Sequence, residues 1–413
     1  MAEVSILRVK ISMQQNQNFL CIFSFGKFSL LELSRLQESP TFDFKILESS
    51  ENSGLIECNL ETAKRLARRS GGIYKVARIC GESADDLLEC LPLPDHSKFN
   101  WTVSGYACDT DLIEDTKTAV FEILKKGDVG KARFVRADSS DETTELKIAD
   151  LSKNILTGDG GKRTSGLDVV VDRTLGRTRY GYTEFASDVE GLYERDFGRP
   201  FQDPTITMGT RLARTLVNLC SLDKGKTILD PFCGLGTILG EAMVCGFNVM
   251  GVEISFTQVG RCRENLDWVR SQYQISPKLS SKVVKADAMK LESLRLPKID
   301  AIATEPILLP KLERNETAVR SAELIRYVSE EYRCALRAFS IILAPGGVVS
   351  IVTPELIDDR GKPHGIDLAQ ISQEYGFQLI SSNLAGVENP ATLPTTKRKI
   401  IQRKVYLLKR LAS

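Results

Sequence analysis

Short apolar segments alternate with helix-like segments along the second half of the chain. The β-prone segments are residues 227–229, 249–252, 282–285, 299–303, 347–352, 377–382 and 400–408, and the helical ones are residues 237–244, 256–273, 317–343 and 366–375. This alternation predicts a doubly wound, mostly parallel sheet of the α/β class that ends in an antiparallel hairpin. Residues 208–222 precede it as an amphipathic helix with apolar residues at helical spacing.

The first half of the chain has shorter and more mixed segments. Residues 6–11 and 19–25 are β-prone and residues 30–36, 60–69 and 84–91 are helix-like, which predicts a small α+β module. The prolines of L-P-L-P-D-H-S-K-F mark its end. A second module follows, with strands predicted at residues 99–106, 132–135 and 167–171 and helices at residues 112–125 and 144–150.

Composition limits the class of protein. A chain of 413 residues with 42% hydrophobic content is long enough for two or three globular domains. No apolar run approaches the roughly 18 residues of a membrane helix, and the first residues lack a basic region followed by an apolar core. We therefore expect a soluble cytoplasmic protein without membrane contact. The net charge of +1 means that any RNA contact must come from local basic patches.

Cysteine and histidine usage excludes several chemistries. The 10 cysteines form no C-x-x-C pair, so neither a zinc site nor a disulfide framework is predicted, and the cysteines are expected to be buried as small apolar residues. The 2 histidines are isolated in polar segments, which argues against histidine triads and metal sites. No metal is expected.

Residues 227–253, T-I-L-D-P-F-C-G-L-G-T-I-L-G-E-A-M-V-C-G-F-N-V-M-G-V-E, predict strand, glycine turn, helix and strand. The dinucleotide fingerprint places G-x-G-x-x-G directly after the strand. Here Asp230 precedes Gly234 and Gly236, and Glu253 closes the next strand, which resembles the S-adenosylmethionine (SAM) loop of class I methyltransferases. Asp230 can hold the SAM ammonium, and Glu253 can accept both ribose hydroxyls. A nicotinamide site and a bare strand-to-helix turn remain as alternatives.

Further cofactor contacts are predicted around this loop. Asp287, at the end of the third strand of the sheet, is placed to hydrogen-bond the adenine amine. The complete predicted cofactor set is Met208, Asp230, Pro231, Cys233, Gly234, Gly236, Thr237, Glu253, Ile254, Asp287 and Ala288.

Three basic clusters are candidates for RNA contact. One lies at helical spacing and ends in Arg68 and Arg69, and a second, D-R-T-L-G-R-T-R-Y-G-Y, places Arg177 and Arg179 next to tyrosines. The third is K-R-K-I-I-Q-R-K near the C-terminus. Arginine beside an aromatic ring suits phosphate and base contact, but a solvated helix face or strand edge has the same composition.

The motifs Y-E-R-D-F-G-R-P, R-L-A-R-T-L-V-N-L and L-D-P-F-C-G-L-G-T-I-L-G-E-A resemble the THUMP-containing tRNA guanosine-N2 methyltransferases (UPF0020-like RNA methylases), which modify the guanosine at position ten. The resemblance is specific over residues 193–265 and rests in the front half on module order and R-R-S-G-G-I-Y-K-V. It implies SAM as cofactor, tRNA as partner and, in some members, a small activator subunit.

The same resemblance implies a division into domains. Residues 1–95 are expected to form an N-terminal ferredoxin-like domain and residues 97–185 a THUMP domain that binds RNA. Residues 186–205 form a linker in which Pro200 and Pro204 prevent helix, and residues 206–413 form a class I methyltransferase domain with a Rossmann-like sheet.

The catalytic motif of that family, D-P-P-Y, lies at the end of the fourth strand of the sheet. Its acid accepts hydrogens from the target amine, and its aromatic ring stacks on the flipped base. In T-E-P-I-L-L-P, Glu305 and Pro306 keep the acid and the first proline, while Ile307 and Leu308 occupy the positions over the base. Since base–aromatic stacking contributes roughly 1–3 kcal/mol, we expect a reshaped pocket or weaker catalysis.

The leading hypothesis is a SAM-dependent tRNA methyltransferase acting on an exocyclic base amine, guanosine N2. A tRNA-binding protein that retains SAM but has weak or no catalysis is one alternative. A methyltransferase acting on adenine N6 in nucleic acid is the other, because it uses the same amine chemistry.

Overall fold

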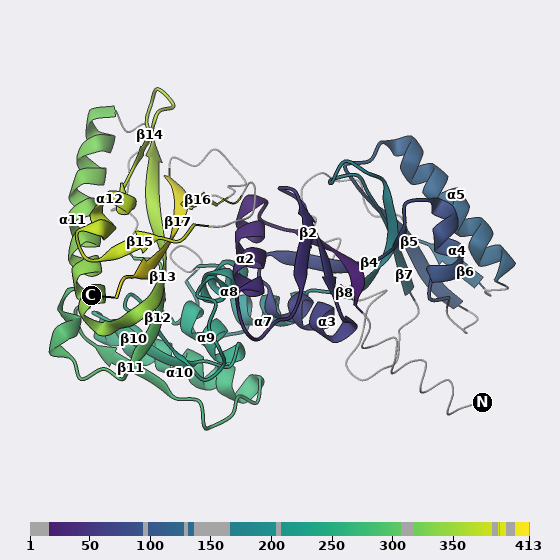
Figure 1. Cartoon of the computed structure of the whole chain (residues 1–413). Coiled ribbons are helices and arrows are strands. Elements are labelled where there is room, and N and C mark those ends of the chain that lie inside the picture. The colour runs from purple at the N-terminus through teal and green to yellow at the C-terminus, as the bar shows by residue number, and fades with distance from the viewer. Residues whose placement is uncertain are drawn as a thin grey trace. The chain divides into compact units, whose positions relative to one another are not determined.

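The computed structural model describes residues 16–93, 98–127, 131–135, 166–203, 208–306, 318–381, 387, 389–393 and 401–412. The segments predicted at residues 6–11 and 144–150 lie outside this part of the chain. Two compact units divide the chain and are described separately (Figure 1). Unit 1 is Met1–Gly26 with Phe42–Gly191, and unit 2 is Lys27–Thr41 with Leu192–Ser413.

Unit 1 is built on a sheet that has eight strands within the described residues, in the order β2-β3-β1-β4-β8-β7-β5-β6. The strands are β1 (Gln17–Phe23), β2 (Lys45–Ser49), β3 (Ser53–Cys58), β4 (Ile73–Gly81), β5 (Lys98–Tyr106), β6 (Lys131–Phe134), β7 (Gly166–Asp172) and β8 (Arg179–Ala186). The helices are α3 (Leu60–Arg69), η1 (Ala84–Asp86), α4 (Leu87–Cys90) and α5 (Thr110–Lys126). The first four strands pair antiparallel in ferredoxin-like order, as predicted.

A buried ion pair joins the two halves of this sheet. Lys75 on β4 is 2% exposed, and its Nζ donates to Asp168 Oδ2 of β7 at 2.7 Å. The hydroxyls of Ser104 on β5 and Thr183 on β8 donate to the same carboxylate. Although burial opposes the charged form, the neighbouring Asp168 raises the pKa of Lys75. The lysine of the S-G-G-I-Y-K-V motif is therefore part of the core of unit 1.

Unit 2 is built on a sheet in the order β11-β10-β9-β12-β13-β17-β15, with β14 on β13 and β16 on β17. The strands are β9 (Thr227–Asp230), β10 (Asn248–Glu253), β11 (Ser281–Lys285), β12 (Ile299–Thr304), β13 (Leu343–Ile357), β14 (Pro363–Gly365), β15 (Phe377–Leu379), β16 (Ala391–Thr392) and β17 (Ile401–Arg410). The helices are α2 (Lys27–Gln37), α7 (Val189–Phe197), which begins in unit 1, α8 (Thr210–Leu219), α9 (Thr237–Val244), α10 (Phe256–Gln272), η2 (Ala288–Ser293), α11 (Ala318–Ile342) and α12 (Leu368–Gln373).

The order of these strands confirms the predicted doubly wound sheet. β9 pairs parallel with β10 on one side and with β12 on the other, and β17 runs antiparallel to β13 and β15. The chain runs outward from β9 to β11 and then returns to β12, so the direction of winding reverses between β9 and β12. In such sheets a ligand crevice lies outside the carboxyl ends of the strands at this point.

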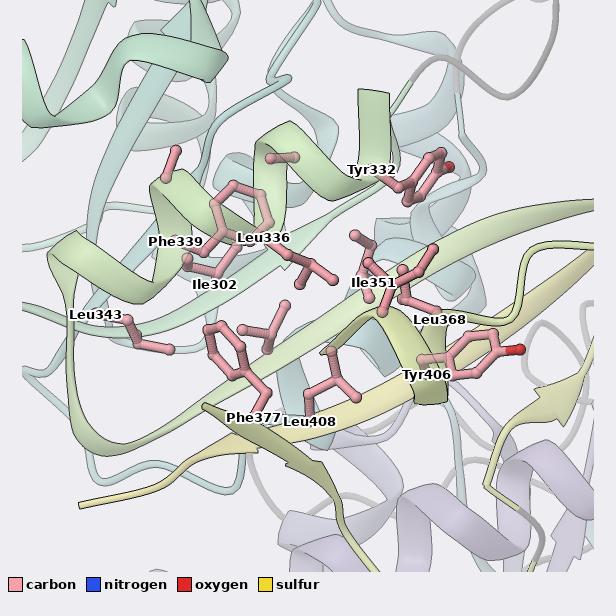
Figure 2. Packing of buried hydrophobic residues seen from close by; sticks show 14 of the residues in the cluster. Ile302, Tyr332, Leu336, Phe339, Leu343, Ile351, Leu368, Phe377, Tyr406 and Leu408 are labelled. Carbon is pink, nitrogen blue, oxygen red and sulfur yellow. The ribbon is translucent and has the colours of Figure 1, made fainter. Parts of the chain in front are cut away.

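Apolar packing between α11 and the sheet forms the core of unit 2. Figure 2 shows Tyr332, Leu336 and Phe339 of α11 directed toward the strands that carry Ile302 and Ile351. The Tyr332 hydroxyl is also satisfied, since it donates to the Val352 carbonyl at 2.9 Å. This packing fixes β12 and β13, and the carboxyl end of β12 leads directly to Glu305.

Helix α2 lies between β1 and β2 in the chain but belongs to unit 2. Its Arg35 Nε donates to the Leu219 carbonyl of α8 at 3.1 Å, and Asn218 Nδ2 donates to its Glu32 Oε1 at 2.7 Å. Buried polar groups of this kind need such partners. The predicted division into residues 1–95, 97–185, 186–205 and 206–413 stays a proposal.

Two local expectations were wrong. The segment predicted as a non-helical linker contains α7, because Pro200 restricts only its own position and the residue before it, whereas α7 ends at Phe197. Cys80 and Cys90 form a disulfide, although the cysteines were expected to be buried thiols. Their spacing matches no disulfide motif, and the fold of β4 onto α4 brings them together.

The turn from β9 to α9 depends on glycine. Gly234 and Gly236 have φ of +48° and +83°, in the left-handed region that other residues avoid. A Cβ at Gly236 would meet Cys262 Sγ of α10 at 2.6 Å, whereas one at Gly234 would meet no atom within 4 Å. Gly236 is therefore required for close packing of the turn on α10, and the loop is open at Gly234.

Lys75→Met is expected to destabilise unit 1 by about 3–5 kcal/mol, because it leaves the Asp168 carboxylate buried without its cation. Urea denaturation of the whole chain measures the change. Lys117→Met is the matched control, because Lys117 pairs with Glu114 on the exposed side of α5, and exposed pairs contribute about 0–1 kcal/mol. Equal losses in the two variants would contradict a structural role for Lys75.

Gly236→Ala is expected to destabilise unit 2 more than Gly225→Ala. Gly225 has a similar φ of +81°, but a Cβ at this position would meet no atom within 4 Å. The loss of stability in Gly225→Ala therefore measures only the cost of a left-handed backbone conformation in a residue with a Cβ, about 1–2 kcal/mol. The additional loss of stability in Gly236→Ala measures the steric contact with Cys262, and overpacking of this kind typically costs about 1–3 kcal/mol. Adding Cys262→Ala should remove this excess in thermal or urea unfolding, and an excess that persists would exclude the contact as its cause.

Candidate cofactor and catalytic site

Asp230 ends β9 with its side chain buried. It is 2% exposed, and its Oδ1 accepts hydrogen bonds from Thr304 Oγ1 of β12 at 2.7 Å and from the Phe232 amide at 3.1 Å. Burial raises the pKa of Asp230 to about 7, against the opposing effect of these two hydrogen bonds. The charges of Glu253 and Glu305 raise it further. Asp230 is thus a buried acid with a pKa of about 7. It lies where the direction of winding of the sheet reverses.

Glu253 ends the neighbouring strand β10 and shapes the loop. Its Oε2 accepts from the Gly234 amide at 3.1 Å and its Oε1 from the Ser255 amide at 2.8 Å. Each oxygen of an ionised carboxylate has room for a further hydrogen bond. Ile254, directly after it, is 67% exposed and presents an apolar side chain next to this acid in the sequence.

Asp287 follows the next strand, β11. Its Oδ1 accepts from the Met289 amide at 2.9 Å, so that it caps η2, and its side chain is 38% exposed. The Ala286 amide donates to the Glu253 carbonyl at 3.1 Å, which ties the end of β11 to the end of β10. Ala288 is buried under this turn. The three predicted cofactor acids therefore stand at the carboxyl ends of adjacent strands.

The remaining predicted cofactor residues surround the same loop or support it. Met208 is buried just before α8, and Pro231 is buried in the turn. Cys233 is buried, with its Sγ 4.0 Å from Cys262 Sγ. Thr237 begins α9, and its hydroxyl accepts from Arg199 Nη1 at 2.8 Å. These residues support the conformation of the glycine turn.

Glu305 follows β12 directly, one residue after Thr304. Its side chain is 12% exposed, and Arg403 Nε of β17 lies 2.9 Å from its Oε1. The contact is an ion pair rather than an aligned hydrogen bond, because this oxygen has no partner of suitable angle. Burial raises the pKa of Glu305, and the charge of Arg403 lowers it. Pro306 is buried next to it, whereas Ile307 and Leu308 lie outside the described residues.

The candidate RNA arginines of the first two basic clusters lie in unit 1, with different exposure. Arg68 is exposed and Arg69 half-buried in the last turn of α3. The Arg177 side chain is 71% exposed, 3.6 Å from Glu82 Oε1. Arg179 is 4% exposed, and its Nη2 donates to Glu48 at 2.7 Å. Arg68 and Arg177 are thus exposed residues, whereas Arg179 is buried and pairs with Glu48.

The motifs Y-E-R-D-F-G-R-P and R-L-A-R-T-L-V-N-L supply buried contacts that sequence reasoning did not assign. Arg195 Nε and Arg214 Nε each donate to the buried Glu241 of α9 at 2.6 Å. Asp196 accepts from the Thr210 amide at 2.8 Å and so fixes the start of α8. A cavity of about 10 Å³ between these residues and Gly236 has room for about one water molecule, far less than a nucleotide requires. This buried cluster positions α9 beneath the glycine turn.

Sequence reasoning also missed Thr304 and the contact of Arg403 with Glu305. Thr304 stands next to Glu305 in A-T-E-P, so its position at a strand end was visible, but its bond to Asp230 depends on strand order. Arg403 was included only in a basic cluster.

Two kinds of feature are absent from the described residues. No helix there combines the length and apolar character that crossing a membrane requires. Nor does that part of the chain bring together three or more His, Cys, Asp or Glu side chains in a group that could hold a metal ion.

Curated relatives share the name of one activity. The tRNA (guanine(10)-N2)-dimethyltransferase of Methanothermobacter thermautotrophicus is 30% identical over 244 residues, which are 57% of this chain and 63% of the relative. The enzyme of the same name from Methanocaldococcus jannaschii is 36% identical over 91 residues, 21% of this chain and 26% of the relative. The chain thus matches less than two thirds of the length of either relative.

Solved structures and a family comparison agree on the methyltransferase fold. TrmN from Thermus thermophilus has a TM-score of 0.51 at 17% identity, covering 95% of this chain and 100% of that one. A possible methylase from Clostridium difficile has a TM-score of 0.50 at 13% identity, with coverage of 97% and 99%. At these identities the likeness concerns the fold alone. Residues 198–347 match the UPF0020 family, RMKL-like methyltransferase domain, which confirms over these residues the resemblance expected from the motifs.

Proposed function

We propose that this chain is a SAM-dependent tRNA methyltransferase that acts on an exocyclic base amine, guanosine N2. The observation that carries the proposal is the hydrogen bond between Thr304 and Asp230, at 2.7 Å. It brings the acid of the glycine loop next to the strand end that carries Glu305. The activity for which the curated relatives are named supports tRNA as the substrate and guanine N2 as the acceptor.

The residues of the glycine loop fit SAM. The Asp230 carboxylate suits the ammonium, since among the described residues no lysine or arginine pairs with it. Glu253 keeps hydrogen-bonding capacity for the ribose hydroxyls, and Asp287 for the adenine amine. Ile254 offers exposed apolar surface to a base, and the open side of Gly234 allows a ligand to approach the backbone. Bound SAM supplies an electrophilic methyl group on a sulfonium.

Glu305 is proposed to act on the target amine. When the amine nitrogen forms its bond to the methyl carbon and the carbon–sulfur bond breaks, the nitrogen becomes cationic and must lose a proton. A carboxylate within hydrogen-bond distance aligns the amine beforehand and accepts that proton. Pro306 would hold the backbone beside it, with Ile307 and Leu308 as apolar cover for the base. The chemistry requires Glu305 to be ionised.

Unit 1 is proposed to bind the tRNA. Arg68, Arg69 and Arg177 are the candidate phosphate contacts, with residues 97–185 as a THUMP domain and residues 1–95 as the ferredoxin-like domain. Arginine contacts to phosphate make affinity depend on salt. A small activator subunit remains a candidate partner.

Incubation with labelled SAM and tRNA transcripts, followed by nucleoside analysis, is expected to yield N2-methylated guanosine. Glu305→Ala should reduce the rate by about a hundredfold or more while the protein still binds SAM, because it removes the group that acts on the amine and keeps the residues of the cofactor loop. Glu323→Ala, an exposed acid on α11, is the control and should retain full activity.

Other outcomes separate the rival functions. Methylated adenosine would favour the adenine-N6 activity. Binding of SAM and tRNA without turnover, with and without a candidate activator subunit, would favour a binding protein and reject the proposal.

Asp230→Asn is expected to stabilise the unliganded protein at pH 8 and to weaken SAM binding. In the folded state the pKa of Asp230 is raised from 3.8 to about 7, so stability is lost as pH rises through that interval. Each pKa unit corresponds to about 1.4 kcal/mol, so the difference between variant and wild type should reach a few kcal/mol and vanish near pH 4. The asparagine keeps the oxygen that accepts both hydrogen bonds.

Unfolding as a function of pH and calorimetry with SAM measure these two effects. Loss of both stability and SAM affinity in the variant would indicate that Asp230 is structural. Unchanged SAM affinity would exclude the ammonium contact.

A further inference from the structure

Arg403 reaches Glu305 through strand pairing. β12 pairs parallel with β13, and β13 pairs antiparallel with β17, where Arg403 lies opposite Pro354. This register places the Arg403 guanidinium at the carboxyl end of β12, with its Nε 2.9 Å from Glu305 Oε1. The Arg403 side chain is 38% exposed and the Glu305 side chain 12% exposed, so the acid is the more buried partner of this ion pair.

The surroundings of Glu305 disfavour its charge. Asp230 of β9 carries like charge when ionised, and the charge of Glu305 raises the pKa of Asp230. Tyr332 of α11 contributes a buried phenol, whose hydroxyl is committed to the Val352 carbonyl. Among the described residues, Arg403 of β17 is the group whose charge favours ionised Glu305. A carboxylate taken out of water is costly unless a cation compensates it.

The adjacent Lys404 provides a comparison within the same strand. Neighbouring residues of a strand point to opposite faces, and Lys404 Nζ pairs with Glu355 Oε1 at 2.5 Å. Lys404 is therefore a cation of the same basic cluster, one position away, that does not contact Glu305. A comparison of variants at Arg403 and Lys404 therefore separates the effect of a positive charge near bound RNA from the effect of a positive charge beside Glu305.

We propose that Arg403 is a positioning residue for methyl transfer, which keeps the Glu305 carboxylate ionised and directs it toward the target amine. The inference rests on the proposed function of Glu305. It also accounts for the longer side chain at this position: a glutamate has one more rotatable bond than an aspartate, and the ion pair fixes its orientation. The proton released by the methylated nitrogen then has an ionised acceptor.

Single-turnover methylation of tRNA by the full chain, measured across pH, tests the proposal. Arg403→Leu should lower the rate at pH 7 by about tenfold or more, because misaligned or protonated Glu305 acts poorly. The loss should shrink as pH rises, since Glu305 ionises at higher pH without its cation, and Arg403→Lys should restore most of the rate. With tRNA at saturating concentration, so that a change in tRNA affinity has no effect, Lys404→Leu should leave the single-turnover rate and its pH profile unchanged.

Two results would overturn the proposal. If Arg403→Leu and Lys404→Leu weaken tRNA binding equally and leave the single-turnover rate intact, Arg403 is an RNA contact. If Arg403→Leu lowers the rate by the same factor at every pH and Arg403→Lys fails to restore it, the residue is structural.

A carboxyl titration separates failure of this inference from failure of the proposed function. Glu305 is observed by NMR in protein labelled at glutamate side-chain carbons, with Glu305→Gln to assign its signal. The pKa of Glu305 should rise in Arg403→Leu and stay near the wild-type value in Lys404→Leu. This result is expected even if the wild-type chain transfers no methyl group to any tRNA, whereas an unchanged pKa in Arg403→Leu would exclude the role of Arg403.

Discussion

The hydrogen bond from Thr304 to Asp230 joins the two strand ends on which the site depends. It crosses from β12 to β9, where the winding of the sheet reverses. Asp230 leads into the glycine turn, and Thr304 leads directly to Glu305. Because parallel strands end at the same edge, one bond of 2.7 Å sets the spacing between the proposed cofactor loop and the proposed catalytic acid. Packing of α11 on β12 and β13 holds that edge in place.

Buried charged side chains support the glycine turn by fixing α9, the helix that follows it. Glu241 of α9 receives Arg195 and Arg214, and all three side chains are almost fully buried. A buried acid with two arginines is stable only while each charge keeps its partners. The polar residues of Y-E-R-D-F-G-R-P thus act within unit 2 as supports of α9, which explains how a motif far from the strand ends can accompany a cofactor loop.

Sequence reasoning located residues in the fold where their positions depend on local sequence, and failed to do so where contacts depend on strand register. Asp230, Gly236 and Glu253 fall within one strand-turn-helix-strand segment, so their order alone predicted their positions at the loop. Arg403 contacts Glu305 only because of the pairing of β17 with β13, which no local pattern encodes. The ion pair of Arg179 could not be predicted for the same reason, because its partner Glu48 comes from a distant segment of unit 1.

Asp230 and Glu305 are both acids whose charged form is disfavoured by burial, but the groups that compensate this effect differ. Burial raises the pKa of both. Glu305 has a cation of the chain itself, Arg403, whereas among the described residues Asp230 is met only by neutral donors, the Thr304 hydroxyl and the Phe232 amide. An acid that acts on an amine must be ionised before the base arrives, so an internal cation suits it. An acid that holds an ammonium needs its counter-charge only when the cofactor is bound, and its unfavourable burial in the free protein then favours binding of that ammonium.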